Sequence, residues 1–375
     1  GVKWNDVQSQ LAFLGVTLKK ADYLNQGLAQ VSVAAGRIST ISDLPFIAYI
    51  NLSFLNNEIL NQRERGMFGL TNLTSLEVAG RNLTGNGITI GIGDNADPYH
   101  LDNTQNLINR NPALATFFNH GRQVTGVIGG DGLIEERYRG VAIKSQLITD
   151  AYDFVISKSD VYFTDYNMTV TNNSYFNGLA GCPGNGEYNE LSEYVDQQMY
   201  NNQLLQHIFA VGNDGNFTCA PFPYSFGTVK SGYQTGKNIL TVGNYSITSD
   251  NLNQGIPGAT SRGPVMDGRI KPEIIASGTS VPSTSYNNIY GTGSGTSFAA
   301  PFVTGVWSLL TERYKQLHAN AYPKSALLKA VICNSGDDRG NAGPDYSWGF
   351  GFINSRKAVE MIEQNHYFTG TLSTG

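Results

Sequence analysis

Short apolar runs that end in Gly, Asn or Asp recur from about residue 80 onward, and stretches with helical spacing separate them. Strands of a parallel sheet are buried on both faces, so they read as continuous apolar runs rather than as alternating patterns. The alternation of such runs with helices predicts an α/β fold with a doubly wound, mostly parallel sheet and helices on both faces. The predicted strands are residues 88–93, 145–149, 170–174, 207–212 and 239–243.

The first 52 residues follow a different pattern. Residues 7–14 have apolar side chains at helical spacing, and residues 29–34 alternate like a strand, which predicts a small α+β unit. A unit of about 50 residues is marginally stable alone, so we expect it to need a partner surface. The predicted domains are an N-terminal unit (1–52), a polar linker (53–79), the main α/β domain (80–366) and a tail with the character of a further domain's start (367–375).

Composition and charge narrow the function classes. The 375 residues include 25 Lys and Arg against 30 Asp and Glu, a net charge of −5, which gives no footprint for nucleic acid. No apolar run approaches about 18 residues, so no membrane-spanning helix is expected. Three cysteines are too few for a disulfide framework. Polar bulk from Asn, Ser, Thr and Gly is typical of secreted proteins, so we expect a secreted or extracytoplasmic protein, although no signal peptide is visible.

A Gly-rich turn leads into an apolar helix at residues 293–301, GSGTSFAAP. Ser297 lies at the start of this predicted helix, where unpaired N–H groups and the helix dipole favour developing negative charge. Pro301 fits the first turn, because its missing N–H costs nothing there. A lone serine in this place is usually an N-cap. The whole string, however, resembles the nucleophile motif Gly-Thr-Ser-x-Ala-Ala-Pro of the subtilisin-like serine proteases, the subtilases.

The candidate base is His120, which opens the string HGRQVTGVIG at residues 120–129. This string resembles the subtilase motif His-Gly-Thr-His-Val-Ala-Gly, although Arg122 and Gln123 replace Thr-His. The alternative is an ordinary surface helix start. The other histidines that we considered are interpreted as structural or as lying on polar helix faces: His207, His318 and His366.

The candidate acid is Asp94, at the end of the apolar run 88–93. The carboxyl edge of a parallel sheet is where such folds present their ligand-binding groups. The segment resembles the subtilase aspartate strand, but Asn95-Ala96 follow Asp94 in place of Ser/Thr-Gly. Asp97, three residues further on, is the competing acid, and an Asp that merely caps a turn is the remaining alternative.

The candidate oxyanion donor is Asn213 in the string FAVGNDG at residues 209–215. The string resembles the subtilase segment Ala-Ala-Gly-Asn-Glu-Gly, whose Asn amide binds the oxyanion. In isolation, Asn and Gly at these positions would be interpreted as a type I′ turn.

The order of the four candidate residues along the chain links the four motifs. Asp94, His120 and Ser297 occur in the order that belongs to the subtilisin class, with Asn213 between His120 and Ser297. The resemblance extends over roughly residues 85–365. It implies a secreted serine endopeptidase in which Ser297 attacks a peptide carbonyl, His120 takes its proton and Asp94 orients the imidazole.

The resemblance also implies a substrate-binding strand at residues 172–178, NNSYFNG. An extended peptide would add a strand beside it and be held by main-chain hydrogen bonds. The residues that we expect to bind substrate are Asn173, Ser174, Tyr175, Phe176, Gly178 and Gly212.

Partners and cofactors follow from the same resemblance. The expected partners are protein or peptide substrates and the chain's own residues 1–52, which resemble the end of a subtilase pro-region and imply a zymogen. The chemistry requires no cofactor. Subtilases often bind structural calcium, but the loop acids here lack regular ligand spacing, so no metal ligand is assigned: Asp131, Glu135, Asp214, Asp337 and Asp338.

Three questions stay open at this point. Cys182 and Cys219 either pair or remain free, whereas Cys333 has the apolar neighbours of a buried thiol. The chain is either an active endopeptidase or a catalytically silent subtilase-like binding module. A nucleotide-binding α/β protein is disfavoured, because Gly91-Ile92-Gly93 is not followed by the glycine that a phosphate loop needs.

Overall fold

The computed structural model describes most of the chain, in two compact units, Gly1–Ile59 and Leu60–Gly375. The predicted linker 53–79 lies mostly outside the described residues, as does Asp97. The described ranges are 3–20, 29–48, 50, 69–76, 80–94, 98–110, 119–178, 181–246 and 255–370.

The N-terminal unit contains two helices and a two-stranded antiparallel sheet. Its elements are α1 (Trp4–Phe13), β1 (Thr17–Lys20), β2 (Gln30–Ser32) and α2 (Ile38–Ser42). Three buried apolar side chains, Leu11, Val16 and Ile41, form its core. Such a small core buries little apolar surface, whereas Phe13 is 90% exposed.

The second unit is built on a seven-stranded sheet with the order β4-β5-β3-β6-β7-β8-β9. Every neighbouring pair in it is parallel, so the predicted doubly wound α/β fold is confirmed. The strands are β3 (Thr89–Asp94), β4 (Leu107–Asn109), β5 (Gln146–Ala151), β6 (Met168–Asn173), β7 (Gln206–Ala210), β8 (Leu240–Tyr245) and β9 (Ile274–Ser277).

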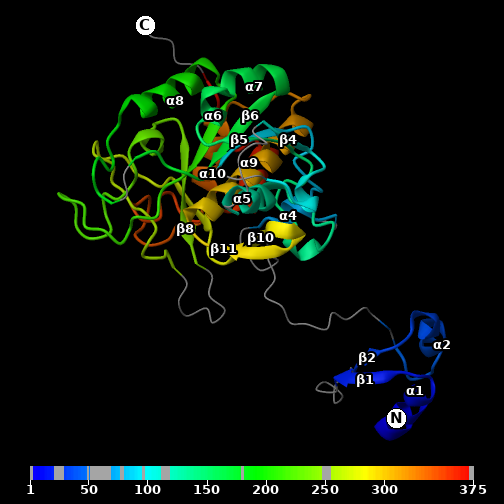
Figure 1. Cartoon of the computed structure of the whole chain (residues 1–375). Coiled ribbons are helices and arrows are strands. Elements are labelled where there is room, and N and C mark those ends of the chain that lie inside the picture. The colour runs from blue at the N-terminus through cyan, green and yellow to red at the C-terminus, as the bar shows by residue number, and fades with distance from the viewer. Residues whose placement is uncertain are drawn as a thin grey trace. The chain divides into compact units, whose positions relative to one another are not determined.

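Helices cover both faces of this sheet (Figure 1). Successive strand residues point to opposite faces: Ile208 and Ala210 belong to the main core, whereas Phe209 between them belongs to a second core. The main core lies under α5 (His120–Gly129) and α9 (Thr296–Leu317). The other face carries α6 (Phe154–Ser157), α7 (Ser159–Tyr166) and α8 (Glu190–Asn201).

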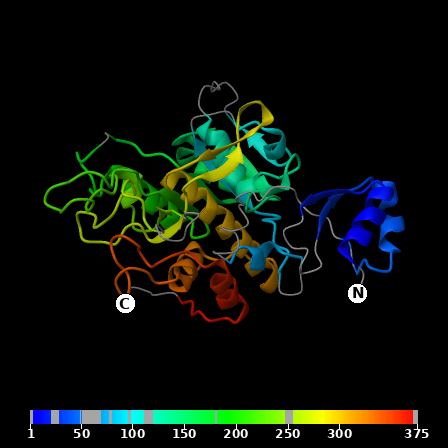
Figure 2. The same cartoon turned by 90° about the horizontal axis from the view of Figure 1, so that it is seen from below.

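Helix α9 is the central helix of the fold, and it contacts β6, β7, β8 and β9. Its Gly305 lets the helix approach Val141 closely, because a Cβ at this position would lie 2.5 Å from the Val141 Cβ. Figure 2 shows α10 (Ser325–Ser335) and α11 (Ser355–Glu363) side by side near α9. Within the described part of the chain, no helix has the length and apolar character needed to cross a membrane.

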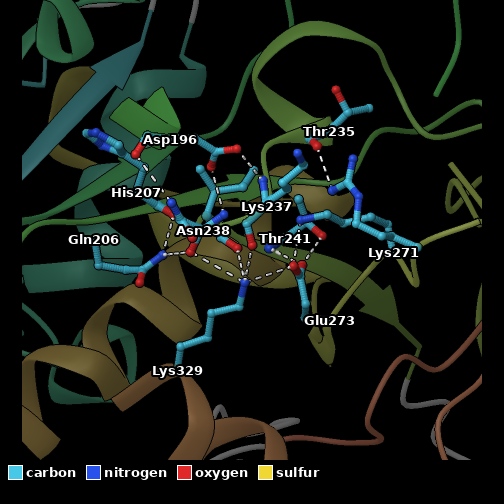
Figure 3. A network of polar contacts seen from close by, with 12 residues as sticks. Asp196, Gln206, His207, Thr235, Lys237, Asn238, Thr241, Lys271, Glu273 and Lys329 are labelled. Atoms are coloured by element: carbon cyan, nitrogen blue, oxygen red, sulfur yellow. Dashed lines mark hydrogen bonds and ion pairs between the residues drawn. The ribbon is translucent and has the colours of Figure 1, made fainter. Parts of the chain in front are cut away.

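A buried ion cluster joins the amino ends of β8 and β9 to α10 (Figure 3). Glu273 accepts hydrogen bonds from the Thr241 N–H at 2.7 Å and from the Lys271 ammonium at 2.5 Å. The Lys329 ammonium lies 3.2 Å from the same carboxylate. Although burial opposes its charge, these cations lower the pKa of Glu273 to about 2, so the carboxylate stays ionised. The ion pair between Glu273 and Lys329 therefore connects α10 to the sheet.

The opposite, carboxyl edge of the sheet gathers the ends of three neighbouring strands. β3 ends at Asp94, β6 at Asn173 and β7 at Ala210. In parallel α/β sheets this edge is the usual place for ligand-binding and catalytic groups. The antiparallel hairpin of β10 (Val281–Thr284) and β11 (Tyr290–Gly293) leads directly into α9.

Candidate active site

The structure places His120 and Asp94 in contact. His120 is the first residue of α5, and its Nδ1 lies 2.9 Å from both carboxylate oxygens of Asp94. The Asp94 side chain is 6% exposed and the His120 side chain 32% exposed. With Nδ1–H donating to the carboxylate, Nε2 of the neutral imidazole is an acceptor, as a general base requires.

The electrostatics of this pair favour the protonated imidazole. Burial lowers the pKa of His120, but the negative charge of Asp94 and its hydrogen bond raise it by more, and the net result is a pKa above the ordinary 6.5. The Asp94 carboxylate therefore stabilises the imidazolium form of His120 relative to the neutral form.

Ser297 is the second residue of α9, and two contacts fix its surroundings. Its Oγ donates a hydrogen bond to the Ser174 carbonyl oxygen at 3.2 Å, and the Ser174 Oγ donates to the Ser297 carbonyl oxygen at 2.9 Å. The His120 ring packs edge to face on the Phe298 ring, with centroids 5.7 Å apart. His120 therefore lies beside the start of α9, while the Ser297 hydroxyl in this structure bonds to Ser174.

Asn213 is held beside the same helix start. Its Oδ1 accepts hydrogen bonds from the Thr296 N–H at 3.0 Å and from the Thr296 hydroxyl at 3.1 Å. Two donors on one atom identify that atom as the amide oxygen, so the Nδ2 group is the end available to an acceptor. Gly212, immediately before it, has φ +119°, a backbone conformation that favours glycine.

The predicted substrate strand, residues 172–178, lies partly inside the sheet and partly beyond its end. Asn173 lies inside the sheet between β3 and β7, and its Nδ2 donates to Thr171 Oγ1 at 2.8 Å. An added strand cannot pair with it, because its sheet neighbours occupy both edges. The prediction that a substrate strand pairs with Asn172 and Asn173 is therefore wrong, because both residues lie inside the sheet. The segment beyond the sheet starts at Ser174.

Aromatic packing supports the segment after Ser174. Tyr175 lies against the rings of Tyr152, Phe209 and Tyr233. Its hydroxyl is buried with no hydrogen-bond partner in the described structure, and burial raises its pKa well above the ordinary value. Phe176, the next residue, is 40% exposed, and the Lys230 Nζ lies 4.8 Å from the centroid of its ring.

Sequence reasoning did not identify Arg122 as part of the site's frame. Its side chain is buried, its Nε donates to the Tyr99 carbonyl oxygen at 2.7 Å, and its guanidinium lies 4.8 Å from the Tyr286 ring centroid. Arg122 thus ties α5 to the loop before η3 (Leu101–Asn103) and to the β10–β11 hairpin. Arg122, which stands where the subtilase motif has Thr, therefore has a structural role. The only sign of this role in the sequence was a positively charged residue within an otherwise apolar predicted helix.

Cys182 and Cys219 form a disulfide, which settles the pairing that the sequence left open. The bond connects the segment after Phe176 with the segment after Asn213. Cys333 is a buried free thiol, as expected. His207, interpreted as structural, is buried inside β7 beside Thr171 Oγ1, and burial lowers its pKa to about 3.

Three of the five acids considered for calcium pair with cations. Asp214 pairs with Lys230, Asp337 with Lys357 and Glu135 with Arg137. Over the described ranges, no three His, Cys, Asp or Glu side chains gather so that they could hold a metal ion. Structural calcium stays a prediction.

Comparisons with known proteins agree with this fold. The family model described as the subtilase family, Peptidase S8, matches residues 32–351. An extracellular serine protease of Serratia marcescens is 30% identical in an alignment of 192 positions that covers 44% of this chain and 17% of that protein. The minor extracellular protease Epr of Bacillus subtilis is 30% identical over 147 residues, 39% of this chain and 18% of that protein. The chain therefore matches less than a fifth of either relative.

Solved structures show the same fold. The CspB protease of Clostridium perfringens has a TM-score of 0.65 at 17% identity, over 80% of this chain and 99% of that one. The protease domain of PatA has a TM-score of 0.57 at 18% identity, over 76% of this chain and 98% of that one. The architecture is thus that of a subtilisin-like α/β protein. The chain belongs to the subtilase family of serine peptidases, and the predicted resemblance is confirmed.

Proposed function

We propose that the chain is a secreted serine endopeptidase in which Asp94, His120 and Ser297 act as the triad. The observation that carries this proposal is the contact of His120 Nδ1 with both oxygens of Asp94, at the start of a helix that lies beside the Ser297 helix. That contact fixes the tautomer in which Nε2 accepts a proton.

Acyl transfer follows from these groups. Ser297 Oγ attacks the peptide carbonyl carbon, and His120 Nε2 takes the hydroxyl proton. When the C–N bond breaks, His120 gives this proton to the leaving amine. A water molecule then attacks the acyl-enzyme, again losing its proton to His120, and the acid product leaves with Ser297 restored. Rotation of the Ser297 hydroxyl from the Ser174 carbonyl toward His120 precedes the attack, and such side-chain rotations are fast.

Asn213 Nδ2 and the Ser297 N–H would receive the oxyanion. The two hydrogen bonds from Thr296 hold the Asn213 amide in one orientation before substrate arrives, which is the preorganisation that oxyanion stabilisation needs.

Replacing Asn213 with alanine should therefore lower kcat by about 10²–10³-fold with little change in KM, a magnitude taken from the corresponding donor in subtilisin. Steady-state kinetics on a peptide substrate would measure it. Asn216→Ala, an exposed asparagine on the same loop, is the matched control and should keep the wild-type kcat. Equal losses in the two variants would contradict the assignment.

Residues 1–52 are proposed to act as a pro-region. Their small core and exposed Phe13 fit a unit that gains stability by docking. We expect mass spectrometry after incubation to find a new N-terminus between residues 53 and 80 in the wild-type chain and not in Ser297→Ala. An active wild-type chain that keeps its original N-terminus would contradict the pro-region.

Export to an extracellular compartment is supported by two observations. The Cys182–Cys219 disulfide is of a kind that persists in oxidising compartments. The relatives from Serratia and Bacillus are named as extracellular proteases.

Endopeptidase activity is tested by incubating the purified whole chain with an unfolded protein and sequencing the products by mass spectrometry. Cuts at internal positions are expected. A catalytically silent binding module would leave the unfolded protein intact, and release of single terminal residues would indicate an exopeptidase instead.

A further inference from the structure

A cavity of about 1000 Å³ lies at the amino edge of the sheet, opposite the edge where β3 and β7 end. Its walls come from the end of α8, the segments that precede β8 and β9, and the first turns of α10. A cavity of this size can hold a small organic ligand. The proposed peptidase chemistry uses none of the residues that line it.

The lining of this cavity is strongly basic, although the whole chain has a net charge of −5. Among the described residues, five cations and one carboxylate line it: Lys237, Arg269, Lys271, Lys324, Lys329 and Glu273. Lysine and arginine are the side chains that proteins use to bind phosphate groups. The lining therefore favours an anionic ligand.

Glu273 does not balance the two lysines beside it. The Lys271 and Lys329 ammonium groups lie 2.5 and 3.2 Å from the same carboxylate oxygen, so two cations share one acid (Figure 3). Burial and the charges of Lys329 and Arg269 lower the pKa of Lys271 to about 8, although Glu273 opposes this change. A further negative charge in the cavity would stabilise both ammonium groups.

Two other lysines of the lining have no acid partner. Lys237 and Lys324 are exposed, and neither forms an ion pair with a residue that the structure describes. Arg269, in contrast, pairs with Asp267 at 2.9 Å. The Asp196 carboxylate accepts the backbone N–H of Lys237 at 2.8 Å and does not line the cavity. The ammonium groups of Lys237 and Lys324 are therefore available to a ligand.

Part of the lining is apolar. Met199, Ile270, Ala330 and Phe350 contribute to it, and the methylene stems of the lysines add to this surface. An inorganic anion would leave these side chains in contact with water. An anion with an apolar body would bury them and gain the corresponding hydrophobic free energy.

We propose that this cavity binds an organic phosphate monoester. A phosphate monoester has a charge of about −1.5 to −2 at pH 7 and three acceptor oxygens, which suits several cations that share few acids. Lys237 and Lys324 donate hydrogen bonds to the phosphate. Lys329 contributes charge, because its ammonium already donates to the backbone carbonyl oxygens before β8. The apolar body of the ligand packs on Met199, Ile270 and Phe350.

The test is isothermal titration calorimetry on the whole Ser297→Ala chain, in which the proposed self-cleavage cannot occur. The probe is n-hexyl phosphate, and inorganic phosphate and 1-hexanol present its two halves separately. We expect one site for n-hexyl phosphate, at least about tenfold weaker binding of inorganic phosphate, and no detectable binding of 1-hexanol at the same concentration.

Variants locate the binding site. Lys237→Met and Lys324→Met should each weaken binding of n-hexyl phosphate by about tenfold, because each removes a hydrogen bond to a charged group. Lys357→Met changes the net charge equally, but this exposed lysine of α11 pairs with Asp337 outside the cavity, so the affinity should not change. Ala330→Trp fills the cavity without altering its charge and should also weaken binding by about tenfold.

Absence of n-hexyl phosphate binding at millimolar concentration would overturn the inference. Equal losses in Lys357→Met and the two cavity variants would also overturn it, because binding would then reflect net charge alone. Equal affinities for n-hexyl phosphate and inorganic phosphate would exclude an organic ligand. If Ala330→Trp fails to fold, as judged by thermal unfolding, the exposed lysine variants decide. Failure of the proposed function has a separate signature, since peptide hydrolysis by the wild-type chain does not involve this cavity.

Discussion

Replacing Ser297 with alanine is expected to lower kcat for peptide hydrolysis by about six orders of magnitude, the size of the loss when the triad serine of subtilisin is removed. The physical reason is that the substitution removes the oxygen that would form the acyl-enzyme. Ser297 lies at the start of α9, where the helix N-terminus and the Ser297 N–H favour the oxyanion. Residual hydrolysis would come from oxyanion binding alone.

Ser294 offers a matched control for this experiment. It belongs to the same Gly-rich turn and is exposed, and its hydroxyl accepts a hydrogen bond from the Ser280 N–H at 2.8 Å. Ser294→Ala should keep kcat within a few-fold of the wild-type value, because its hydroxyl has no part in the proposed chemistry. A Ser297→Ala chain that retained wild-type kcat would exclude Ser297 as the nucleophile.

Replacing Asp94 with asparagine should lower kcat by about 10⁴-fold, as the same substitution does in a chymotrypsin-type triad. An asparagine amide cannot accept the Nδ1–H at both of its terminal atoms, so the imidazole loses its fixed tautomer. Asp97→Asn, which removes the competing acid of the sequence, is the control and should keep the wild-type kcat. A large loss in Asp97→Asn with none in Asp94→Asn would reverse the assignment.

The pH dependence supplies an independent readout of the same variant. His120 must be neutral to act as a base, so kcat/KM should rise with pH through the raised pKa of His120, above 6.5. In Asp94→Asn the contributions that raise this pKa are lost and the burial that lowers it remains. The acid limb of the pH profile should therefore shift to lower pH. A shift to higher pH, or no shift, would contradict the role given to Asp94.

The sheet was predictable because its strands are buried on both faces. The run 88–93 differs by one residue from β3, and 207–212 overlaps β7. The end of the 170–174 run was less well defined, since Asn172 and Asn173 are polar yet fully buried. The Asn172 Oδ1 accepts a hydrogen bond from the Thr304 hydroxyl, and the Asn173 Nδ2 donates to the Ile208 carbonyl oxygen. Partners so distant in the sequence are not visible in a local pattern.

Candidate site residues were predictable where one short stretch of sequence contains both the reactive residue and the residues that set its backbone conformation. GSGTSFAAP is such a string, and the structure begins α9 within it. Lys230 and Arg122 had no such signal. Each is a buried cation whose partners lie on other elements: Asp214 and Phe176 for Lys230, Tyr99 and Tyr286 for Arg122. Their roles arise only when the chain is folded.

The most direct measurement of the central claim is covalent labelling with a fluorophosphonate followed by peptide mapping. The reagent's phosphorus bonds to an activated serine oxygen and fluoride leaves, so labelling reports nucleophilicity rather than binding. We predict a single adduct on Ser297 in the wild-type chain and background labelling in a folded His120→Ala variant. An adduct on another residue, or equal labelling of Ser297 in His120→Ala, would contradict the account.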